Sequence, residues 1–469
     1  MEFFEQSLVG LATALRGGEV SPVDVARHFL ERIDAAGELG AFVEVISERA
    51  LAQAADLGDP PVDAPPLWGV PLADKDLVAR AGVPTRYGSR AFAENLSADS
   101  DPLALALDRL GSVSLGKTNT PEFGLTGYTE SAIAPPARNP WNTDTGAGGS
   151  SGGAATAVAA GLLPAAPASD GGGSIRIPAA TVGVVGLKPS RGRLPFANGL
   201  ESPGGLSTAG PIARSVADVG YLLDALAGSA PHSYATRAPD PEGGGASAAL
   251  RRDPGRLRIG ATLVTPWDGW TDTSLDPRAR AAYDGAAAIL VSAGHAVDEA
   301  DWRPEGYPEM FATLWRASAA RIPVPDADLD ALTEPLTAWL VREGRAMSAE
   351  RVIGGYQAAA AFERRTIEAF APFDAVLTPA LAMEPQKVGW FSSVDPEENF
   401  ARQCSYAPHT SFVNVSGLPA ITVPVTSEEG ERPWSVQLVG RPGGEAAILQ
   451  LAAQLEAARG PLPWPTLTY

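Results

Sequence analysis

The chain has 469 residues, of which 45% are hydrophobic, and its formal net charge is −19 at pH 7. This length and composition predict one large core with an attached or inserted lobe. A strongly acidic chain repels phosphate backbones and anionic membranes, which argues against nucleic acid and membrane as partners. Residues 1–60 are predicted to be helical, with Ser21 as a helix N-cap followed by Pro22 at the first helical position.

Metal and disulfide chemistry are not expected. Cys404 is the only cysteine, so neither an intrachain disulfide nor a cysteine-based zinc site is predicted. The four histidines are far apart in sequence and lack metal-ligand spacing: His28, His232, His295 and His409. We therefore expect no metal and no organic cofactor. The chain also lacks the pattern of a signal peptide and any apolar run of about 18 residues, which predicts a cytoplasmic location.

Further along the chain the pattern changes from one segment to the next. Residues 61–234 alternate short apolar runs with helical stretches, which is typical of an α/β sheet covered on both faces. Residues 235–256, rich in Pro, Gly and Ala, predict a loop or linker. Residues 257–371 predict a strand followed by a mostly helical, substrate-binding lobe. Residues 372–469 predict a return to the core sheet and a final helix from about 445 to 458.

Two short motifs resemble known sites. Residues 111–118 fit the phosphate-loop pattern G-x-x-x-x-G-K-[ST], but that loop needs a strand before it and a helix after it. Because a helical segment precedes them, we predict a buried strand instead. Residues 148–152 fit the G-x-S-x-G elbow of α/β-hydrolases, with Ser150 as nucleophile. Residues 143–147 do not have the strand pattern that an elbow requires, and this interpretation stays an alternative.

A stronger signal comes from a run of glycines that ends in a serine. Gly171, Gly172 and Gly173 precede Ser174, and consecutive glycines let backbone N–H groups converge on one point that can hold an oxyanion. A serine at the end of such a run is placed to attack the carbonyl whose oxygen is held there. The serine also needs a base, and no histidine is near it in sequence.

A buried lysine can act as the base if its surroundings lower its pKa. Lys75 follows the apolar residues 69–73, which is a plausible place for a buried lysine. The alternative is a surface lysine paired with Asp74 or Asp76.

These stretches closely resemble the amidase signature family, and the resemblance extends from about residue 7 to residue 458. It is also carried by residues 117–123, 138–142, 183–189 and 414–420. The resemblance implies an α/β fold with a mixed central sheet flanked by helices and an inserted helical lobe. It implies a Ser–cis-Ser–Lys triad in which Ser174 is the nucleophile, Ser150 is the bridging serine and Lys75 is the terminal base.

The resemblance also assigns roles around the triad. Gly149 precedes the cis peptide bond of Ser150, and the N–H groups of Gly171, Gly172, Gly173 and Ser174 would form the oxyanion hole. Ser151 is interpreted as the cap of a helix that begins near residue 152. Asp170 and Arg176 are interpreted as a structural ion pair that holds the loop. The chain departs from the family at Gly171, where a residue with a β-carbon is usual, and at Ala147, where proline is common; neither change removes a catalytic group.

The function predicted from this resemblance is hydrolysis of carbon–nitrogen amide bonds. The alternative within the family is the glutamine-dependent amidotransferase subunit that releases ammonia from glutamine for charged tRNA, for which we would expect glutamine at the position of Ile177. We therefore favour a stand-alone amidase. An alternative from another class of protein is a non-catalytic scaffold that kept only the fold. The expected partner is a small-molecule amide, and a homodimer is left open.

The expected substrate class rests on aromatic residues. Residues 300–412 contain 14 of the 33 aromatic residues, and aromatic walls favour neutral, apolar or aryl groups. The alternative is that these rings only form the core of the lobe. The resemblance points towards aryl-acylamidases and hydrolases of nylon-type oligomers, with esters and carbamates as side substrates. The aromatic residues that we selected are Trp302, Trp315, Trp339, Trp390, Phe391 and Tyr406.

Overall fold

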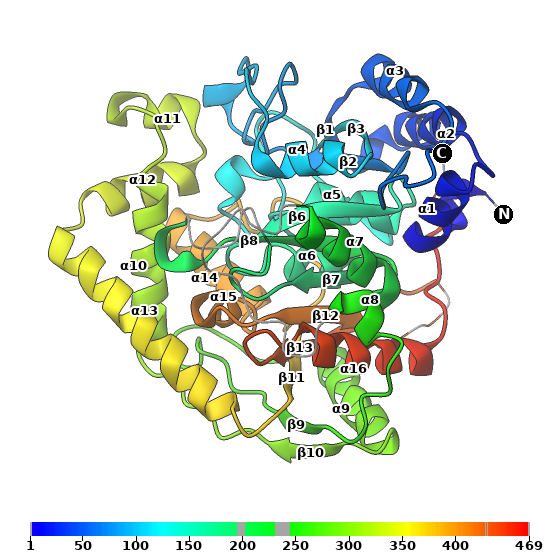
Figure 1. The fold of residues 1–469 in the computed structure, drawn as a ribbon. Coiled ribbons are helices and arrows are strands. Elements are labelled where there is room, and N and C mark those ends of the chain that lie inside the picture. The colour runs from blue at the N-terminus through cyan, green and yellow to red at the C-terminus, as the bar shows by residue number, and fades with distance from the viewer. Residues whose placement is uncertain (1, 195–201, 230–243, 427, 429, 468–469) are drawn as a thin grey trace.

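The structure is a computed structural model that describes residues 2–194, 202–229, 244–426, 428 and 430–467 (Figure 1). Residues 235–243 of the predicted linker and His232 lie outside the described residues. Of the predicted linker, residues 245–249 form the short helix α8 (Gly245–Ala249). In the part of the chain that is described, no helix combines the length and the apolar character needed to cross a membrane.

A mixed sheet of eight strands forms the centre of the molecule, in the order β10-β9-β11-β13-β12-β7-β8-β6. β9 pairs in parallel with β10 and β11, and the other neighbours are antiparallel. The mixed sheet predicted from the resemblance is thereby confirmed. The strands are β6 (Ala165–Asp170), β7 (Val185–Lys188), β8 (Thr208–Ala213), β9 (Arg258–Ala261), β10 (Ala296–Glu299), β11 (Ala375–Pro379), β12 (Ala420–Pro424) and β13 (Ser435–Gly440).

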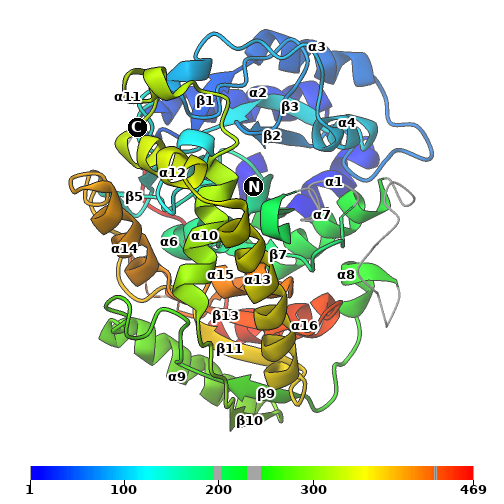
Figure 2. The same cartoon turned by 90° about the vertical axis from the view of Figure 1, so that its left-hand side faces the viewer.

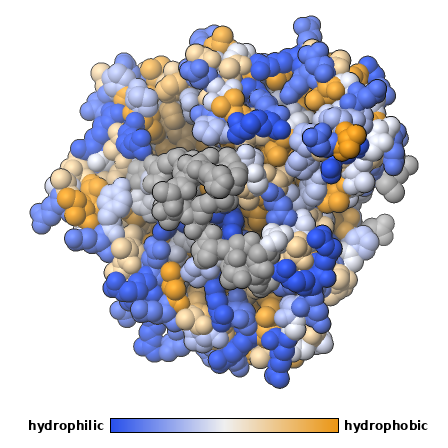
Figure 3. Space-filling model, viewed as in Figure 1, coloured by the Kyte–Doolittle hydropathy of each residue, from blue (hydrophilic) through white to orange (hydrophobic). Residues whose placement is uncertain are grey.

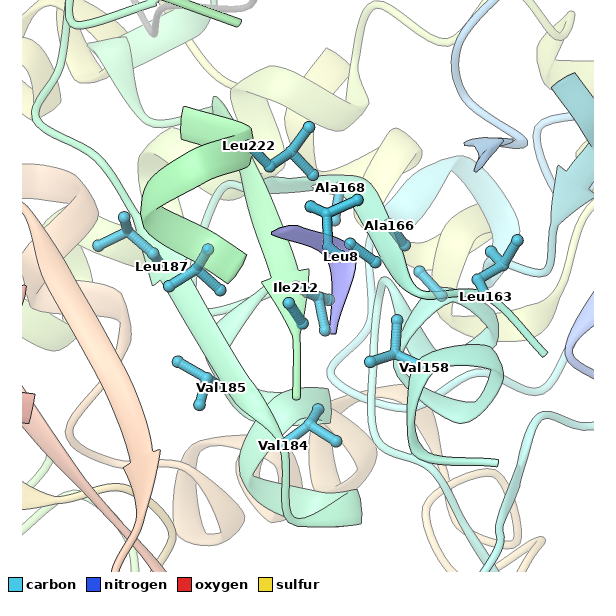
Figure 4. Packing of buried hydrophobic residues seen from close by; sticks show 14 of the residues in the cluster. Leu8, Val158, Leu163, Ala166, Ala168, Val184, Val185, Leu187, Ile212 and Leu222 are labelled. Atoms are coloured by element: carbon cyan, nitrogen blue, oxygen red, sulfur yellow. The ribbon is translucent and has the colours of Figure 1, made fainter. Parts of the chain in front are cut away.

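Helices cover this sheet, and its central strands β11, β12 and β13 are buried along their whole length, whereas the edge strand β10 is partly exposed. α9 and α16 pack against β13, and α16 also contacts α7 and α8. α5 and α6 pack against each other and against strands of the same sheet. Figure 4 shows the core between these layers, where Leu187 and Ile212 of neighbouring strands lie near Leu222 of α7. The helices are α5 (Gly152–Ala159), α6 (Arg176–Val182), α7 (Val216–Gly228), α9 (Pro277–Ser292) and α16 (Glu445–Arg459).

A smaller sheet with the order β1-β3-β2 lies beside the large one. β2 (Pro71–Lys75) runs parallel to β3 (Val113–Thr118) and packs against β6, which brings the end of β2 close to the end of β6. α2 (Pro22–Ala35) and α3 (Ser47–Leu57) cover this sheet, with α1 (Leu8–Arg16) and α4 (Pro102–Arg109) nearby.

Residues 1–60 contain the predicted helices and one exception. Ser21 caps α2 as predicted, because its hydroxyl accepts a hydrogen bond from the N–H of Val23 at 3.2 Å. β1 (Phe42–Val45), by contrast, is a strand in a segment predicted to be helical. It pairs with β3 at the edge of the small sheet, so its conformation depends on a partner about 70 residues away in sequence.

The helical lobe packs beside the sheet, and its long helix α13 runs along the outside of the molecule (Figures 1 and 2). α10 packs against α12 and α13, α13 packs against α15, and α12 packs against α14. Strands β9 and β10, which precede these helices in sequence, belong to the large sheet. The segment predicted as a lobe therefore also contributes two strands to the core. The helices are α10 (Tyr307–Ala319), α11 (Leu329–Leu332), α12 (Pro335–Arg345), α13 (Ala349–Phe370), α14 (Pro396–Tyr406) and α15 (Ser411–Ser416).

The surface agrees with the acidic, polar composition. Figure 3 shows hydrophilic residues spread over the visible face, with hydrophobic residues scattered among them. Scattered apolar residues are normal on a protein surface and do not mark a docking site.

Candidate active site

Three residues that are far apart in sequence meet where β2, β6 and the loop before α5 converge. Lys75 is the last residue of β2, Ser150 lies two residues before α5, and Ser174 lies between β6 and α6. Lys75 Nζ donates a hydrogen bond to Ser150 Oγ at 2.7 Å. The backbone N–H of Ser151 donates to the carbonyl oxygen of Ser174 at 3.1 Å, which holds the two serine-bearing loops together.

Lys75 is buried, and its environment favours the neutral amine. Burial lowers the pKa of Lys75 to about 7, and the negative charge of Asp170 opposes only part of this shift. The interpretation of Lys75 as a surface lysine paired with an aspartate is wrong. Asp74 pairs with Arg80 and Asp76 pairs with Lys117, so neither carboxylate is the partner of Lys75.

Sequence reasoning missed the second partner of Lys75. Its Nζ also donates to Ser169 Oγ at 3.2 Å. Ser169 is the penultimate residue of β6, and its approach to Lys75 depends on the packing of β2 against β6. The only signal for it in the sequence is that it precedes Asp170, next to the glycine run.

The loop that carries Ser150 is tightly packed. The peptide bond between Gly149 and Ser150 is cis, and the carbonyl oxygen of Ser150 accepts a hydrogen bond from Thr120 Oγ1 at 3.0 Å. A β-carbon at position 149 would lie 2.6 Å from the carbonyl carbon of Tyr128. Only glycine therefore fits at Gly149, which fixes the path of the backbone immediately before the serine.

Ser151 differs from its predicted role. It occupies the N-cap position of α5, but its hydroxyl caps no N–H of that helix. Instead, Ser151 Oγ donates to the carbonyl oxygen of Ser169 at 3.2 Å. The predicted cap is therefore wrong, because β6 offers the hydroxyl an acceptor that local sequence rules cannot anticipate.

Asp170 and Arg176 form a fully buried ion pair under the glycine loop. Arg176 donates to both carboxylate oxygens, through Nε at 3.0 Å and Nη2 at 2.9 Å. Burial alone would raise the pKa of Asp170, but the charge and hydrogen bonds of Arg176 outweigh it and hold this pKa well below its usual value. Asn414 donates to the same carboxylate at 2.8 Å and also accepts from Arg176, which ties α15 to the loop.

The glycine run only partly matches the predicted oxyanion hole. The N–H of Gly173 donates to Asp170 Oδ1 at 2.8 Å, so this group is already engaged and its predicted role as an oxyanion donor needs correction. The N–H groups of Gly171, Gly172 and Ser174 have no acceptor among the described residues. Gly173 itself has a φ of +130°, and a β-carbon there would lie 2.5 Å from Thr410 Oγ1, so the position requires glycine.

Ser174 and Gly172 line a cavity with apolar walls. Among the described residues no charged side chain lines it. No group of the described residues donates a hydrogen bond to Ser174 Oγ or accepts one from it. Cys404 contributes a buried thiol whose pKa burial raises well above its usual value, so it stays neutral. The other lining residues are Leu125, Thr126, Gly127, Ile177, Trp267, Phe311, Trp315, Phe400, Gln403, Ala407, Thr410 and Ser411.

The aromatic walls are mostly not the rings selected from the sequence. Of those six residues only Trp315 lines the cavity. Trp302 lies in the core of the lobe, 4.5 Å from the ring of Phe412, whereas Phe391 stacks on Tyr128 at 4.9 Å. Trp390, Phe391 and Tyr406 belong to that second cluster, and Trp339 packs at the edge of the lobe core. Trp267, which does line the cavity, lies outside the segment that the sequence favoured.

The phosphate-loop motif is a structural strand. Residues 113–118 form β3, which follows α4 and is buried along its whole length. Lys117 is buried and faces Asp76 at 3.3 Å, with its Nζ also donating to the carbonyl oxygen of Val78. The prediction of a buried strand after a helix is confirmed.

The structure corrects one premise of the elbow interpretation. Of residues 143–147, which we predicted not to form a strand, residues 143–146 belong to β5 (Asn142–Gly146), which pairs with β4 (Arg138–Asn139) in a separate two-stranded sheet. Its first three residues are exposed, which is why no apolar strand pattern is visible in the sequence. The elbow interpretation requires a histidine as the base of Ser150, and the group that contacts Ser150 Oγ is Lys75.

None of the described histidine rings is hydrogen-bonded to Ser150 or Ser174. His295 Nε2 contacts Gln454 Oε1 at 2.7 Å, and His409 Nε2 contacts the carbonyl oxygen of Leu263 at 3.1 Å. Burial lowers the pKa of His409 to about 4. In the ranges that the structure describes, no cluster of three or more His, Cys, Asp or Glu side chains could hold a metal.

Comparison with known proteins places this geometry in a family. A family model described as Amidase matches residues 24–449. The protein named "Putative amidase AmiB2" of Mycobacterium tuberculosis is 37% identical, over 94% of this chain and 92% of its own length. A glutamyl-tRNA(Gln) amidotransferase subunit of a Synechococcus strain is 34% identical, over 94% and 95%. The solved structure of 6-aminohexanoate cyclic dimer hydrolase with its substrate has a TM-score of 0.87 at 28% identity and covers 98% of both chains.

The fold and these matches define an enzyme that hydrolyses carbon–nitrogen bonds of amides. The chain belongs to the amidase signature family, as its motifs indicated.

Proposed function

We propose that this enzyme is a stand-alone amidase that cleaves small neutral amides through an acyl-enzyme on Ser174, with Ser150 and Lys75 as its proton relay. The observation that carries the proposal is the 2.7 Å hydrogen bond between Lys75 Nζ and Ser150 Oγ, made by a lysine whose pKa burial lowers to about 7. An amine that is largely neutral near pH 7 can accept a proton from a hydroxyl.

The first step of the mechanism is activation of the nucleophile. Neutral Lys75 takes the proton of Ser150, and Ser150 takes the proton of Ser174, whose oxygen attacks the carbonyl carbon. Among the described residues Ser174 Oγ makes no hydrogen bond, so this step requires that its contact with Ser150 form when substrate is bound.

The second step is stabilisation of the oxyanion. The free N–H groups of Gly171, Gly172 and Ser174 are the available donors, and the buried Asp170–Arg176 pair holds the loop that presents them. Because Gly173 donates to Asp170, the carboxylate positions the loop and does not touch substrate. Such preorganised donors lower the barrier where negative charge develops.

The third step is release of the amine. Ser150 returns its proton to the leaving nitrogen, the acyl group stays on Ser174, and a water molecule activated by the same relay completes hydrolysis. Esters and carbamates offer the same carbonyl to the same nucleophile, which supports side activity on them.

The cavity supports the substrate class. Its walls combine aromatic and aliphatic side chains with uncharged polar ones, and no charged side chain among the described residues lines it, which suits neutral acyl groups. Glutamine carries an ammonium and a carboxylate that would lose hydration there without a charged partner. Ile177 also lines the cavity at the position where the amidotransferase subunit is expected to have glutamine. These points favour a stand-alone amidase, and its cytoplasmic location and a homodimer stay predictions.

A competitive substrate panel tests this function. We expect higher kcat/KM for anilides and medium-chain acyl amides than for glutamine, asparagine or malonamate, graded within about 10–200-fold because apolar pockets discriminate weakly. Each activity should vanish in Ser174→Ala, which assigns it to this site. If glutamine were the best substrate, both the apolar-cavity argument and the stand-alone assignment would fail.

A further inference from the structure

Two buried side chains donate hydrogen bonds to one hydroxyl oxygen in the wall of the cavity. Tyr307 Oη donates to Ser411 Oγ at 2.9 Å, and Trp267 Nε1 donates to the same oxygen at 3.3 Å. A serine hydroxyl has two acceptor positions and one O–H donor. Both acceptor positions of Ser411 are therefore filled by the protein, and only its own proton remains to be placed.

The proton of Ser411 has no acceptor among the described residues. Ser411 is the first residue of α15, is 5% exposed and lines the cavity. A buried donor without an acceptor is costly, so an acceptor supplied from the cavity would be bound favourably. Because the two donors occupy the other positions around the oxygen, the O–H is left to point towards the cavity.

The other hydroxyl and amide groups that line the cavity use their donors within the protein. Thr126 Oγ1 donates to the carbonyl oxygen of Tyr128 at 2.7 Å, and Thr410 Oγ1 donates to that of Gly172 at 2.8 Å. Gln403 Nε2 donates to Asn399 Oδ1 at 2.7 Å. Ser411 thus differs from every neighbour of its kind except the proposed nucleophile.

The ring of Trp315 does not offer an equivalent donor at this point. Its Cη2 and Cζ3 atoms, which are opposite Nε1 on the indole, lie 3.7 Å from where a β-carbon on Gly171 would be. The indole therefore presents its hydrocarbon edge to the glycine loop. The Cβ of Ser411, which carries the hydroxyl, lies 3.9 Å from the equivalent point on Gly172.

We propose that Ser411 determines specificity by donating a hydrogen bond to an oxygen acceptor carried by the acyl group of the substrate, such as a keto, ether or second amide oxygen. The assignment to the acyl side rests on the proposed function, in which Ser150 returns a proton to the leaving amine. The amine must then face Ser150, which does not line the cavity, and the acyl group takes the cavity itself. A donor group on the substrate would not be recognised, because both acceptor positions of Ser411 are filled.

The test uses matched anilides whose acyl chains differ in one atom. In each pair, one methylene of the chain is replaced by an ether oxygen, and the oxygen is moved along the chain from pair to pair. For at least one position, wild-type kcat/KM should be roughly fivefold higher for the oxygen compound, about the effect of one net hydrogen bond. In Ser411→Ala that ratio should fall to about one, and Ser411→Thr, which keeps a hydroxyl, should retain more of it.

Ser416→Ala is the matched control, because Ser416 lies in the same helix and its hydroxyl donates to the carbonyl oxygen of Phe412 at 2.9 Å, within the helix. This variant should keep the wild-type ratio. The wild-type series alone decides the matter if Ser411→Ala does not fold: ratios near or below one at every position would overturn the proposal. An unchanged ratio in Ser411→Ala, or a preference that follows oxygen in the amine portion, would also overturn it. Failure of the proposed function looks different, since glutamine would then be a better substrate than every anilide of the series, or anilide hydrolysis would persist in Ser174→Ala.

Discussion

Acidification below pH 7 is expected to inactivate the enzyme by protonating Lys75. Only the neutral amine can accept a proton, and burial lowers the pKa of Lys75 to about 7. The neutral fraction of such a group falls from about nine-tenths at pH 8 to about one-tenth at pH 6, so kcat/KM should fall roughly tenfold over this range. Below pH 6 it should fall about tenfold for each further unit.

The assay is kcat/KM for a neutral anilide, which does not titrate in this range, measured from pH 5.5 to 9. Lys188→Met is the control, because burial also lowers the pKa of Lys188 to about 7 while its Nζ donates to the carbonyl oxygen of Pro189. The midpoint should persist in Lys188→Met, and Lys75→Ala should lose at least about 10²-fold in rate. A rate that is flat with pH, or a midpoint that disappears with Lys188, would refute the assignment of Lys75 as the base.

Three further predictions concern the supports of the site. Asp170→Asn should lower the free energy of unfolding by about 3–5 kcal/mol in chemical denaturation, because it leaves the Arg176 charge buried without its counter-charge; a change under 1 kcal/mol would contradict this. Gly173→Ala should destabilise the fold by about 1–3 kcal/mol and lower activity, since the added carbon meets Thr410 at a φ of +130°; a fully active, equally stable variant would disprove it. Single replacements of His295 and His409 should keep kcat/KM within about tenfold of the wild-type value, well short of the loss expected for a proton-transfer group. An inactive histidine variant would contradict the assignment of Lys75 as the base.

The sequence could indicate the candidate catalytic groups because their signal is local. A run of glycines before Ser174 and an apolar segment before Lys75 are visible without any knowledge of distant contacts. Their meeting point depends on the packing of β2 against β6, and here the resemblance to a family supplied what residue patterns could not.

Details that depend on tertiary partners were not predictable. The N–H of Gly173 donates to the carboxylate of Asp170, and the hydroxyl of Ser151 donates to the carbonyl oxygen of Ser169 in β6. Local rules for helix caps and glycine loops cannot foresee these acceptors. Likewise, no sequence pattern distinguishes Trp267, whose side chain lines the cavity, from Trp302, whose side chain lies in the core of the lobe. The difference depends on how the lobe packs against the rest of the chain.

We propose that Ser174 forms the covalent bond to substrate. The most direct measurement is intact-protein mass after reaction with a serine-directed phosphonate, followed by identification of the labelled peptide. The account predicts one adduct on Ser174 in the wild type and none in a folded Ser174→Ala variant. Labelling that persists in Ser174→Ala but is lost in Ser150→Ala would make Ser150 the nucleophile and contradict the account.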